Sequence, residues 1–287
     1  MPAIFGLSTP NGLRAVPKSD PPPNSSRHDP FYDRLLKAFL LAVILAQAGF
    51  AAFPGVDLAV SRLFSDAQGV FWANLGPWPV VNAVNKKLME LVAVLLVIGV
   101  LLGASTGRLR GADLRCWAFA ALNVVIAPGL IVNLVLKSHL GRARPDYVAE
   151  FGGPAAFTPA FQVTDQCVTN CSFTSGEVSL AASLAICAVV MLWRQLRISG
   201  RVGAVALAMS VIVVVSMLRI SLGRHFLSDA VFSVIVSAAV AMALYPLLDM
   251  RSARTTFAPL APVFWLRVRL IKGYAISVAQ LRHWFAS

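Results

Sequence analysis

Two residues in the last third of the chain could form a nucleophile and its partner. His225 and Asp229 are four residues apart, so on a helix they would share one face within hydrogen-bonding reach. A carboxylate that accepts a hydrogen bond from one imidazole nitrogen fixes the tautomer and leaves the other nitrogen free to attack an electrophile. Such pairs are also common as structural contacts, so their chemistry depends on what surrounds them.

Three cations at the ends of apolar stretches, Lys137, Arg144 and Arg219, could surround a phosphoryl group. Phosphoryl transfer depends mainly on positioning and on neutralising charge on the equatorial oxygens. Guanidinium groups do this through paired hydrogen bonds, and an ammonium group does it as a point charge. Ser175 and Gly176 begin another apolar stretch, where backbone N–H groups and the positive end of a helix would attract an anion. Together these parts form a phosphate site that requires no metal and no cofactor.

The elements that must position these residues are membrane-spanning helices. Of the 287 residues, 57% are hydrophobic and only 13% are charged, and the mean hydropathy is +0.72. The apolar residues form long runs, as expected of helices that cross a bilayer in roughly 17–25 residues. Six such runs occur, at residues 35–53, 88–105, 116–136, 177–193, 202–218 and 229–249. We therefore predict an all-α polytopic membrane protein, a bundle of six transmembrane helices.

Two tails flank this six-span domain, which covers residues 35–249. Residues 1–34 contain Pro21-Pro22-Pro23 and many polar residues but no apolar core, which predicts a disordered cytoplasmic tail rather than a signal peptide. Residues 250–287 mix aromatic and basic side chains, which predicts an amphipathic cytoplasmic tail on the anionic inner leaflet.

The net charge of +12 could indicate nucleic-acid binding, but the positions of the cations argue against it. Most Lys and Arg residues fall in the two tails and in the loops after the second and fourth runs, as the positive-inside rule predicts for cytoplasmic segments. The others fall on the opposite face: Arg62, Lys86 and Lys87 in the first outer loop, and Lys137, Arg142, Arg144, Arg219 and Arg224 at the outer ends of spans three and five. Snorkelling explains one or two such cations, whereas five from two spans indicate an anion site on the extracytoplasmic face.

The spacing of these residues resembles a known family. Lys137, six intervening residues and Arg144-Pro145 are similar to the first signature of the type 2 phosphatidic acid phosphatase (PAP2) family. Arg219, five residues, His225, three residues and Asp229 are similar to its third, with Leu218 in place of the usual serine. The second signature is Pro-Ser-Gly-His, and here it reads Thr-Ser-Gly-Glu at residues 174–177. The resemblance covers roughly residues 85–248.

The resemblance implies a six-helix bundle and a metal-independent phosphatase of membrane lipids. It implies that His225 attacks phosphorus to form a phosphohistidine and that Asp229 orients His225. It further implies a clamp for the phosphoryl oxygens, made by Lys137, Arg144, Arg219, Ser175 and Gly176. Water would then hydrolyse the intermediate.

Glu177 departs from the family pattern, because it replaces the histidine that protonates the leaving oxygen. A carboxylic acid can do that work if burial keeps it protonated, whereas the three nearby cations favour the carboxylate. Thr174 and Glu177 also fit a helix capping box, with Thr174 as N-cap and Glu177 reaching back to its amide. Both roles, general acid and helix cap, remain open on the sequence alone.

The loop that precedes this segment contains two cysteines, Cys167 and Cys171. An outward-facing loop lies in an oxidising compartment, so a disulfide between them is plausible if their Cα atoms come within roughly 7 Å. The loop from Asp146 to Thr174 is long, and we expect it to cover or gate the site.

These features favour a phosphatase of the inner (plasma) membrane with both termini cytoplasmic and an extracytoplasmic site. The sequence leaves the lipid open among phosphatidic acid, phosphatidylglycerol phosphate, undecaprenyl diphosphate and lipid A phosphates. One alternative is a phosphotransferase that passes the phosphate to another lipid. Another is a non-catalytic scaffold or transporter, against which the joint presence of the signature residues argues.

Overall fold

The computed structural model describes residues 30–257, and in this part of the chain the regular elements are all helical. The internal contacts divide the chain at Ala42 into two units. Among the described residues, the first unit contains the beginning of α1 (Pro30–Ala52), and the second contains the rest of α1 and the other helices. The amphipathic tail predicted from the aromatic and basic residues lies almost entirely beyond the described residues.

Five of the described helices are long and apolar enough to cross a membrane, which makes the chain a multi-pass membrane protein. They comprise residues Tyr32–Ala52, Trp78–Ser105, Gly111–His139, Ile198–Ser221 and Leu227–Leu247. The fourth predicted span corresponds to α6 (Gly176–Leu192), an apolar helix of 17 residues. At 1.5 Å per residue this helix is about 26 Å long, slightly less than the ~30 Å of a bilayer's hydrocarbon core.

The second span begins ten residues earlier than predicted, because α3 runs from Trp78 to Ser105. Lys86 and Lys87 therefore lie within a helix rather than in an outer loop, and that assignment was wrong. Both ammonium groups pair with Glu90 one turn later, at 3.8 and 3.2 Å. These pairs let a helix continue through a basic stretch that the hydropathy alone assigns to a loop.

The third span changes its winding before it reaches the site. It starts as α4 (Gly111–Val124), continues as a π-helix over Val125–Leu136 and ends as α5 (Lys137–His139). Pro128 lies inside the widened segment, where its missing N–H group removes one bond from an already altered ladder. Lys137 is the first residue after the π-helix.

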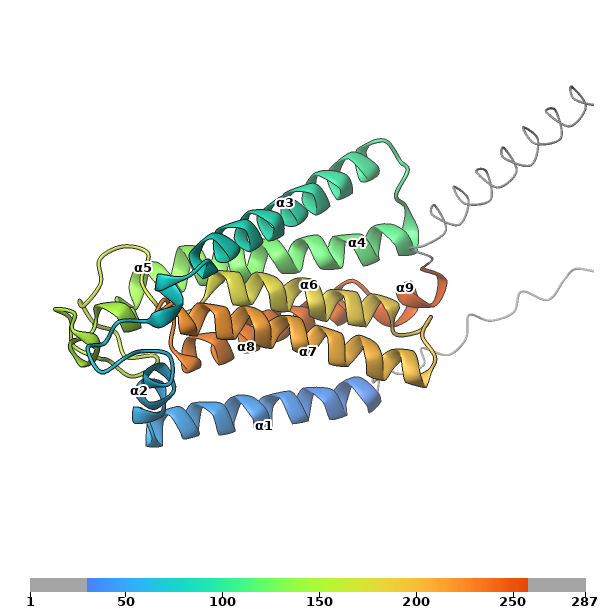
Figure 1. Ribbon diagram of the computed structural model, residues 1–287. Helices are drawn as coiled ribbons and strands as arrows, with labels where there is room; N and C mark the ends of the chain where they lie inside the picture. The colour runs from blue at the N-terminus through green and yellow to red at the C-terminus, as the bar shows by residue number, and fades with distance from the viewer. Residues whose placement is uncertain (1–29, 258–287) are drawn as a thin grey trace, which may run out of the picture. The chain divides into compact units, whose positions relative to one another are not determined.

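Helix α6 packs against both α7 (Ile198–Ser221) and α8 (Leu227–Leu247), and the three run side by side in Figure 1. Serine side chains join α6 to α8. The hydroxyl of Ser233 donates to the carbonyl of Ser175, and the hydroxyl of Ser237 donates to the carbonyl of Ser179, both at 2.9 Å. Small residues allow such close approach, and these four serines are completely buried. We call them the serine ladder.

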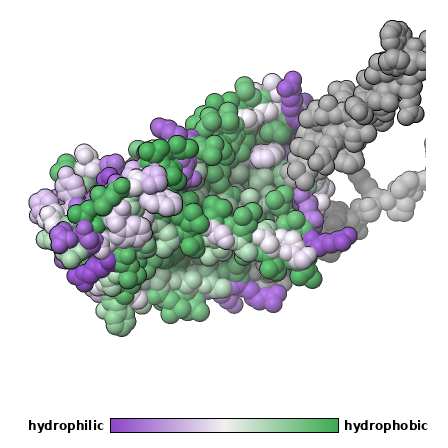
Figure 2. Space-filling model, in the orientation of Figure 1, coloured by the Kyte–Doolittle hydropathy of each residue, from purple (hydrophilic) through white to green (hydrophobic). Residues whose placement is uncertain are grey.

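The largest hydrophobic cluster lies toward the end of the bundle away from His225. It includes Cys116 and Phe119 of α4 and Met250 and Ala253 of the short helix α9 (Met250–Thr256). In Figure 2 apolar side chains cover the length of the helices and hydrophilic ones gather toward their ends. Many large apolar side chains are exposed along α3 and α7, which is what a surface in contact with lipid tails requires.

Candidate active site

His225 does not lie on a helix with Asp229, contrary to the sequence-based expectation. It precedes Phe226, the N-cap of α8, whereas Asp229 is the third residue of that helix. Asp229 Oδ2 accepts the N–H of Phe226 at 2.8 Å, as an acidic residue in a first helical turn often does. His225 Nδ1 is 3.6 Å from the same oxygen, which is longer than a hydrogen bond.

The main chain of Ser172 fixes the imidazole of His225 instead. Its carbonyl oxygen lies 2.7 Å from His225 Nδ1. Because a carbonyl only accepts, Nδ1 must carry the proton and Nε2 must carry the free lone pair. Burial lowers the pKa of His225 to about 3; Arg219 and Lys137 lower it further and Asp229 opposes them. The ring is therefore neutral at physiological pH, with Nε2 available as a nucleophile.

Behind His225, Asp229 belongs to a closed polar network that the sequence did not reveal. Its two oxygens accept from the Ser172 hydroxyl at 2.5 Å and from Arg142 Nη1 at 2.6 Å. Arg142 is only 1% exposed and also donates to Asp57 at 2.7 Å and to the carbonyl of Thr158 at 2.8 Å. A buried ion pair of this kind is stabilising only when its remaining hydrogen-bonding groups are satisfied, as they are for this guanidinium.

Asp57 connects this network to a second helix. It lies in α2 (Gly55–Arg62) and accepts from both the N–H and the hydroxyl of Ser228, at 2.8 and 2.5 Å. Its carboxylate thereby caps the first turn of α8 from outside that helix. Burial raises the pKa of Asp57, and the neighbouring Arg142 opposes this shift.

One sequence signal, the glycine before Arg142, could have separated Arg142 from Arg144. Side chains two residues apart in an extended segment share one side, yet Arg142 is buried and Arg144 is partly exposed. The adjacent Gly141 adopts a positive φ of 64° and passes so close to the carbonyl of Thr164 that no side chain would fit. Asp57 offers no comparable signal, since nothing in its local sequence indicates a distant partner.

A cavity of about 180 Å³ adjoins His225 and brings together most of the predicted site residues. Lys137, Gly176, Glu177, Arg219 and His225 all line it. The lining also includes residues that were not predicted: Lys86 and Glu90 of α3, Asn133 of the third span, and Asn170. Arg144 and Ser175 are not among the lining residues. The cavity therefore combines a neutral imidazole with at least two cations from different helices.

Arg219 and Glu177 form an ion pair at the wall of this cavity. Arg219 Nη1 is 3.0 Å from Glu177 Oε1, and the two side chains are 9% and 13% exposed. Within the described residues, Arg219 Nε and Glu177 Oε2 are buried without a hydrogen-bond partner. Buried polar atoms are rarely left unpaired, so this pair retains hydrogen-bonding capacity for a ligand.

The capping box predicted for the start of α6 is absent, because the N-cap is Ser175 rather than Thr174. The Ser175 hydroxyl accepts the N–H of Val178 at 3.4 Å, which makes Glu177 the second helical residue, unable to close a box. The helix-cap role of Glu177 is therefore wrong. Gly176 packs closely against the third span, because a Cβ there would lie 2.7 Å from Asn133 Oδ1 and would push that side chain aside.

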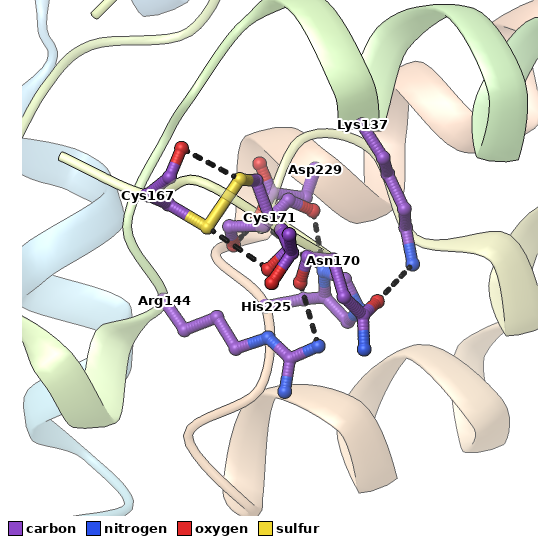
Figure 3. The surroundings of a disulfide bond; sticks show 9 residues. Lys137, Arg144, Cys167, Asn170, Cys171, His225 and Asp229 are labelled. Atoms are coloured by element: carbon purple, nitrogen blue, oxygen red, sulfur yellow. Dashed lines mark hydrogen bonds and ion pairs between the residues drawn. A yellow bond between two sulfur atoms is a disulfide. The ribbon is translucent and has the colours of Figure 1, made fainter. Parts of the chain in front are cut away.

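Lys137 and Arg144 meet at Asn170, as Figure 3 shows. Lys137 Nζ donates to the side-chain oxygen of Asn170 at 3.4 Å, and Arg144 Nη2 donates to its main-chain oxygen at 2.8 Å. Asn170 precedes Cys171, whose sulfur is bonded to that of Cys167, with the Cα atoms 5.6 Å apart. Burial lowers the pKa of the Arg144 guanidinium, and Arg224 nearby adds to that shift.

Comparison with known proteins identifies a family and several relatives of this chain. The PAP2 superfamily model matches residues 117–253, which include the second half of the bundle and all the site residues named above except those of α2 and α3. The chain is 33% identical over 220 residues to a lipid A 4′-phosphatase of Rhizobium leguminosarum, covering 70% of this chain and 91% of that protein. It is 31% identical over 220 residues to a lipid A 4′-phosphatase of Rhizobium etli, covering 70% and 82% of the two chains.

A third relative, the lipid A 4′-phosphatase of Francisella tularensis subsp. novicida, is 37% identical over 114 residues, 40% of this chain and 50% of that protein. No solved structure matches the chain. The family match and the relatives that align over most of their length identify the family of this chain. The imidazole beside a cavity lined by cations is consistent with that family. The chain belongs to the PAP2 superfamily and is a membrane lipid phosphatase.

Proposed function

We propose that this chain hydrolyses the 4′-phosphate of lipid A through a phosphohistidine intermediate at His225, on the extracytoplasmic face of the inner membrane. The choice of lipid is supported by the two relatives that align over more than four-fifths of their length, both lipid A 4′-phosphatases. The observation that carries the chemistry is the neutral His225, whose Nδ1 is bound to the Ser172 carbonyl beside a cavity containing Lys137 and Arg219.

In the first step His225 Nε2 attacks phosphorus and the bond to the lipid oxygen breaks. The imidazole becomes positively charged as the N–P bond forms, and the nearby Asp229 carboxylate stabilises that charge. Lys137, Arg144 and Arg219 neutralise the phosphoryl oxygens, with the N-terminus of α6 at Gly176 adding its positive end. In the second step water attacks phosphorus, the N–P bond breaks, and inorganic phosphate leaves.

Glu177 is placed to move the protons of both steps. The lipid oxygen that leaves the phosphoryl group needs a proton. A bound phosphate monoanion carries one, and Glu177 can relay it to that oxygen. The carboxylate left behind can then take a proton from the attacking water, as a general base does. Its pairing with Arg219 at 3.0 Å and its place in the lining of the cavity at His225 support this role.

The side of the membrane is supported by two features. Most Lys and Arg residues outside the site lie in segments that the positive-inside rule assigns to the cytoplasm, and the site lies at the opposite ends of the helices. The Cys167–Cys171 disulfide adjoins the site, and disulfides persist in oxidising compartments rather than in the cytosol. Labelling of a Val163→Cys variant in whole cells with a membrane-impermeant maleimide tests this, since Val163 is 71% exposed in the same loop. Labelling only after cell lysis would place the site on the cytoplasmic side.

The substrate is tested by phosphate release from lipid A, phosphatidic acid, phosphatidylglycerol phosphate and undecaprenyl diphosphate, using the purified full-length protein with and without EDTA. We expect release from lipid A to be fastest and unchanged by EDTA, because protein cations supply the neutralisation. His225→Ala should reduce release to background. Preferential release from another lipid would overturn the substrate, and transfer of labelled phosphate to a second lipid would identify a phosphotransferase.

The intermediate is tested by brief reaction with ³²P-labelled lipid, followed by denaturation. We expect label on the protein that survives alkali and is lost in acid, as phosphohistidine is, and that is absent from His225→Ala. Glu177→Ala should retain this label while slowing turnover, and Glu177→His should restore turnover. Near-full activity of Glu177→Ala would rule out the proton-transfer role.

A further inference from the structure

The disulfide beside the site closes a ring of only five residues, Cys167–Cys171. Asn170 lies inside this ring and adopts a left-handed backbone conformation with φ of 52°. Residues other than glycine adopt that conformation at a cost, which is lowest for Asn and Asp, and they keep it where the surrounding structure holds them. The covalent ring is one such constraint, because it leaves the main chain at Asn170 few alternatives.

Asn170 uses two different oxygens to contact two of the clamp cations. Its side-chain oxygen accepts from Lys137, and its main-chain oxygen accepts from Arg144. Figure 3 shows the residue lying between these two side chains, next to His225. Lys137 lies at the end of a helix, and Arg144 lies in the extended segment that follows it. Asn170 forms a hydrogen bond with each of them.

The cavities on either side of Asn170 show why this contact matters. The cavity at His225 contains Lys137 and Arg219 but not Arg144. Arg144 lines a second cavity of about 450 Å³, together with Tyr147, Gln166 and Thr169. Asn170 lines both cavities. Asn170 therefore lies between Arg144 and the cavity that contains Lys137 and Arg219.

We propose that Asn170, held by the Cys167–Cys171 disulfide, is the positioning residue of the phosphate clamp. Its two oxygens orient Lys137 and Arg144 so that their remaining N–H donors converge on one phosphoryl group. The proposal rests on the proposed function, because it takes these two cations as phosphate ligands. Asn170 acts through these two cations, so we expect its effect on the affinity for the phosphoryl group rather than on the chemical step.

The test uses inorganic phosphate as a probe, through its inhibition constant against lipid hydrolysis by the purified full-length protein. Asn170→Ala should weaken phosphate inhibition and raise KM by roughly tenfold with kcat nearly unchanged, since it removes one hydrogen bond to a charged group. Val163→Ala, the same truncation at an exposed position of the same loop, should change neither constant by more than about twofold. Thermal unfolding should be unaffected in Val163→Ala and lowered only slightly in Asn170→Ala, because alanine tolerates the left-handed conformation less well than asparagine.

The disulfide is tested in the same assay. The Cys167→Ser/Cys171→Ser double variant and the wild type reduced with a phosphine should both resemble Asn170→Ala, and the double variant should not respond to the reductant. Cys116 and Cys187 are free and buried, so they act as internal controls for thiol labelling of the reduced ring. Unchanged phosphate inhibition after verified reduction would overturn the role of the disulfide.

A double-mutant cycle separates this inference from the proposed function. Because Asn170 acts partly through Lys137, Asn170→Ala should have little further effect on phosphate inhibition in a Lys137→Ala background. If Lys137→Ala and Arg144→Ala leave phosphate inhibition unchanged, the clamp itself is wrong. If Lys137→Ala and Arg144→Ala weaken phosphate inhibition and Asn170→Ala does not, only the role of Asn170 is overturned. Tighter phosphate binding by Asn170→Ala would show that Asn170 competes with the anion, which also contradicts the proposal.

Discussion

Behind His225, Arg142 uses all three of its guanidinium nitrogens on Asp57, Asp229, Ser228 and the carbonyl of Thr158, at 2.6–2.8 Å. In front of His225, Lys137 reaches its partner only at 3.4 Å, and Arg219 keeps one nitrogen unpaired among the described residues. Both regions contain arginines and carboxylates from several helices. The difference is that every guanidinium nitrogen of Arg142 has a partner, whereas Arg219 Nε has none among the described residues, as the proposed anion site requires.

The sharpest way to break this comparison is to remove one arginine from each region. Arg142→Leu should destabilise the protein by about 3–5 kcal/mol, because it leaves two buried carboxylates without their cation. Arg144→Leu should cost less than about 1 kcal/mol, since that side chain is partly exposed and bonds one carbonyl. Thermal unfolding in detergent measures both. Equal stability losses would show that the two regions are not different in kind.

A change within the open region should affect catalysis rather than stability. Arg219→Lys keeps the charge but loses the planar fork, and we expect kcat/KM to fall by roughly a hundredfold. Arg115→Lys is a suitable control, since Arg115 forms a half-exposed ion pair with Asp249 in another part of the chain. Retention of full activity by Arg219→Lys would mean that this residue supplies only charge.

A smaller effect is expected from a single hydroxyl in the closed region. Ser172→Ala removes the 2.5 Å hydrogen bond to Asp229 but keeps the carbonyl that holds His225. We expect a stability loss of about 2 kcal/mol, typical of a hydrogen bond to a charged group, and a loss of activity below about tenfold. Ser183→Ala is the matched control, because the Ser183 hydroxyl is buried without a partner among the described residues. Similar losses at the two serines would contradict the network.

The smallest expected effect concerns pH. Folded His225 stays neutral down to about pH 3, whereas an unfolded histidine takes up a proton below about pH 6.5. Between these values the unfolded state binds more protons, so stability falls as pH falls. From pH 7 to pH 5 this residue should account for a loss of about 1–2 kcal/mol. Comparing the unfolding of wild type and His225→Ala at both pH values measures it, and parallel losses would show that His225 does not titrate in this way.

The sequence predicted those parts of the molecule that depend on periodicity and spacing. The apolar runs identified the helices, and the spacing around Lys137, Arg219 and His225 identified three residues that line one cavity. Lys86 was assigned to a loop because hydropathy does not register the charge pairs with Glu90 that allow a helix to continue.

Contacts between distant elements could not be predicted in this way. The anchor of His225 is a main-chain carbonyl 53 residues away, and no pattern of side chains reveals a carbonyl. Glu177 was weighed as an acid or a cap, but its observed partner, Arg219, comes from another helix and depends on how α6 packs against α7. Asp57 and Asn170 are single polar residues whose roles arise only from tertiary packing.

The serine ladder between α6 and α8 has a consequence for how a bulky lipid enters the site. Bonds from hydroxyls to main-chain carbonyls at two successive turns make these helices resist sliding or separating during turnover. Helix α3 also borders the cavity, yet its only buried residues are Ala93 and Val100. Of the helices around the cavity, α3 is therefore the one that can move most easily. We expect the acyl chains of the lipid to pass beside α3 while α6 and α8 keep their positions.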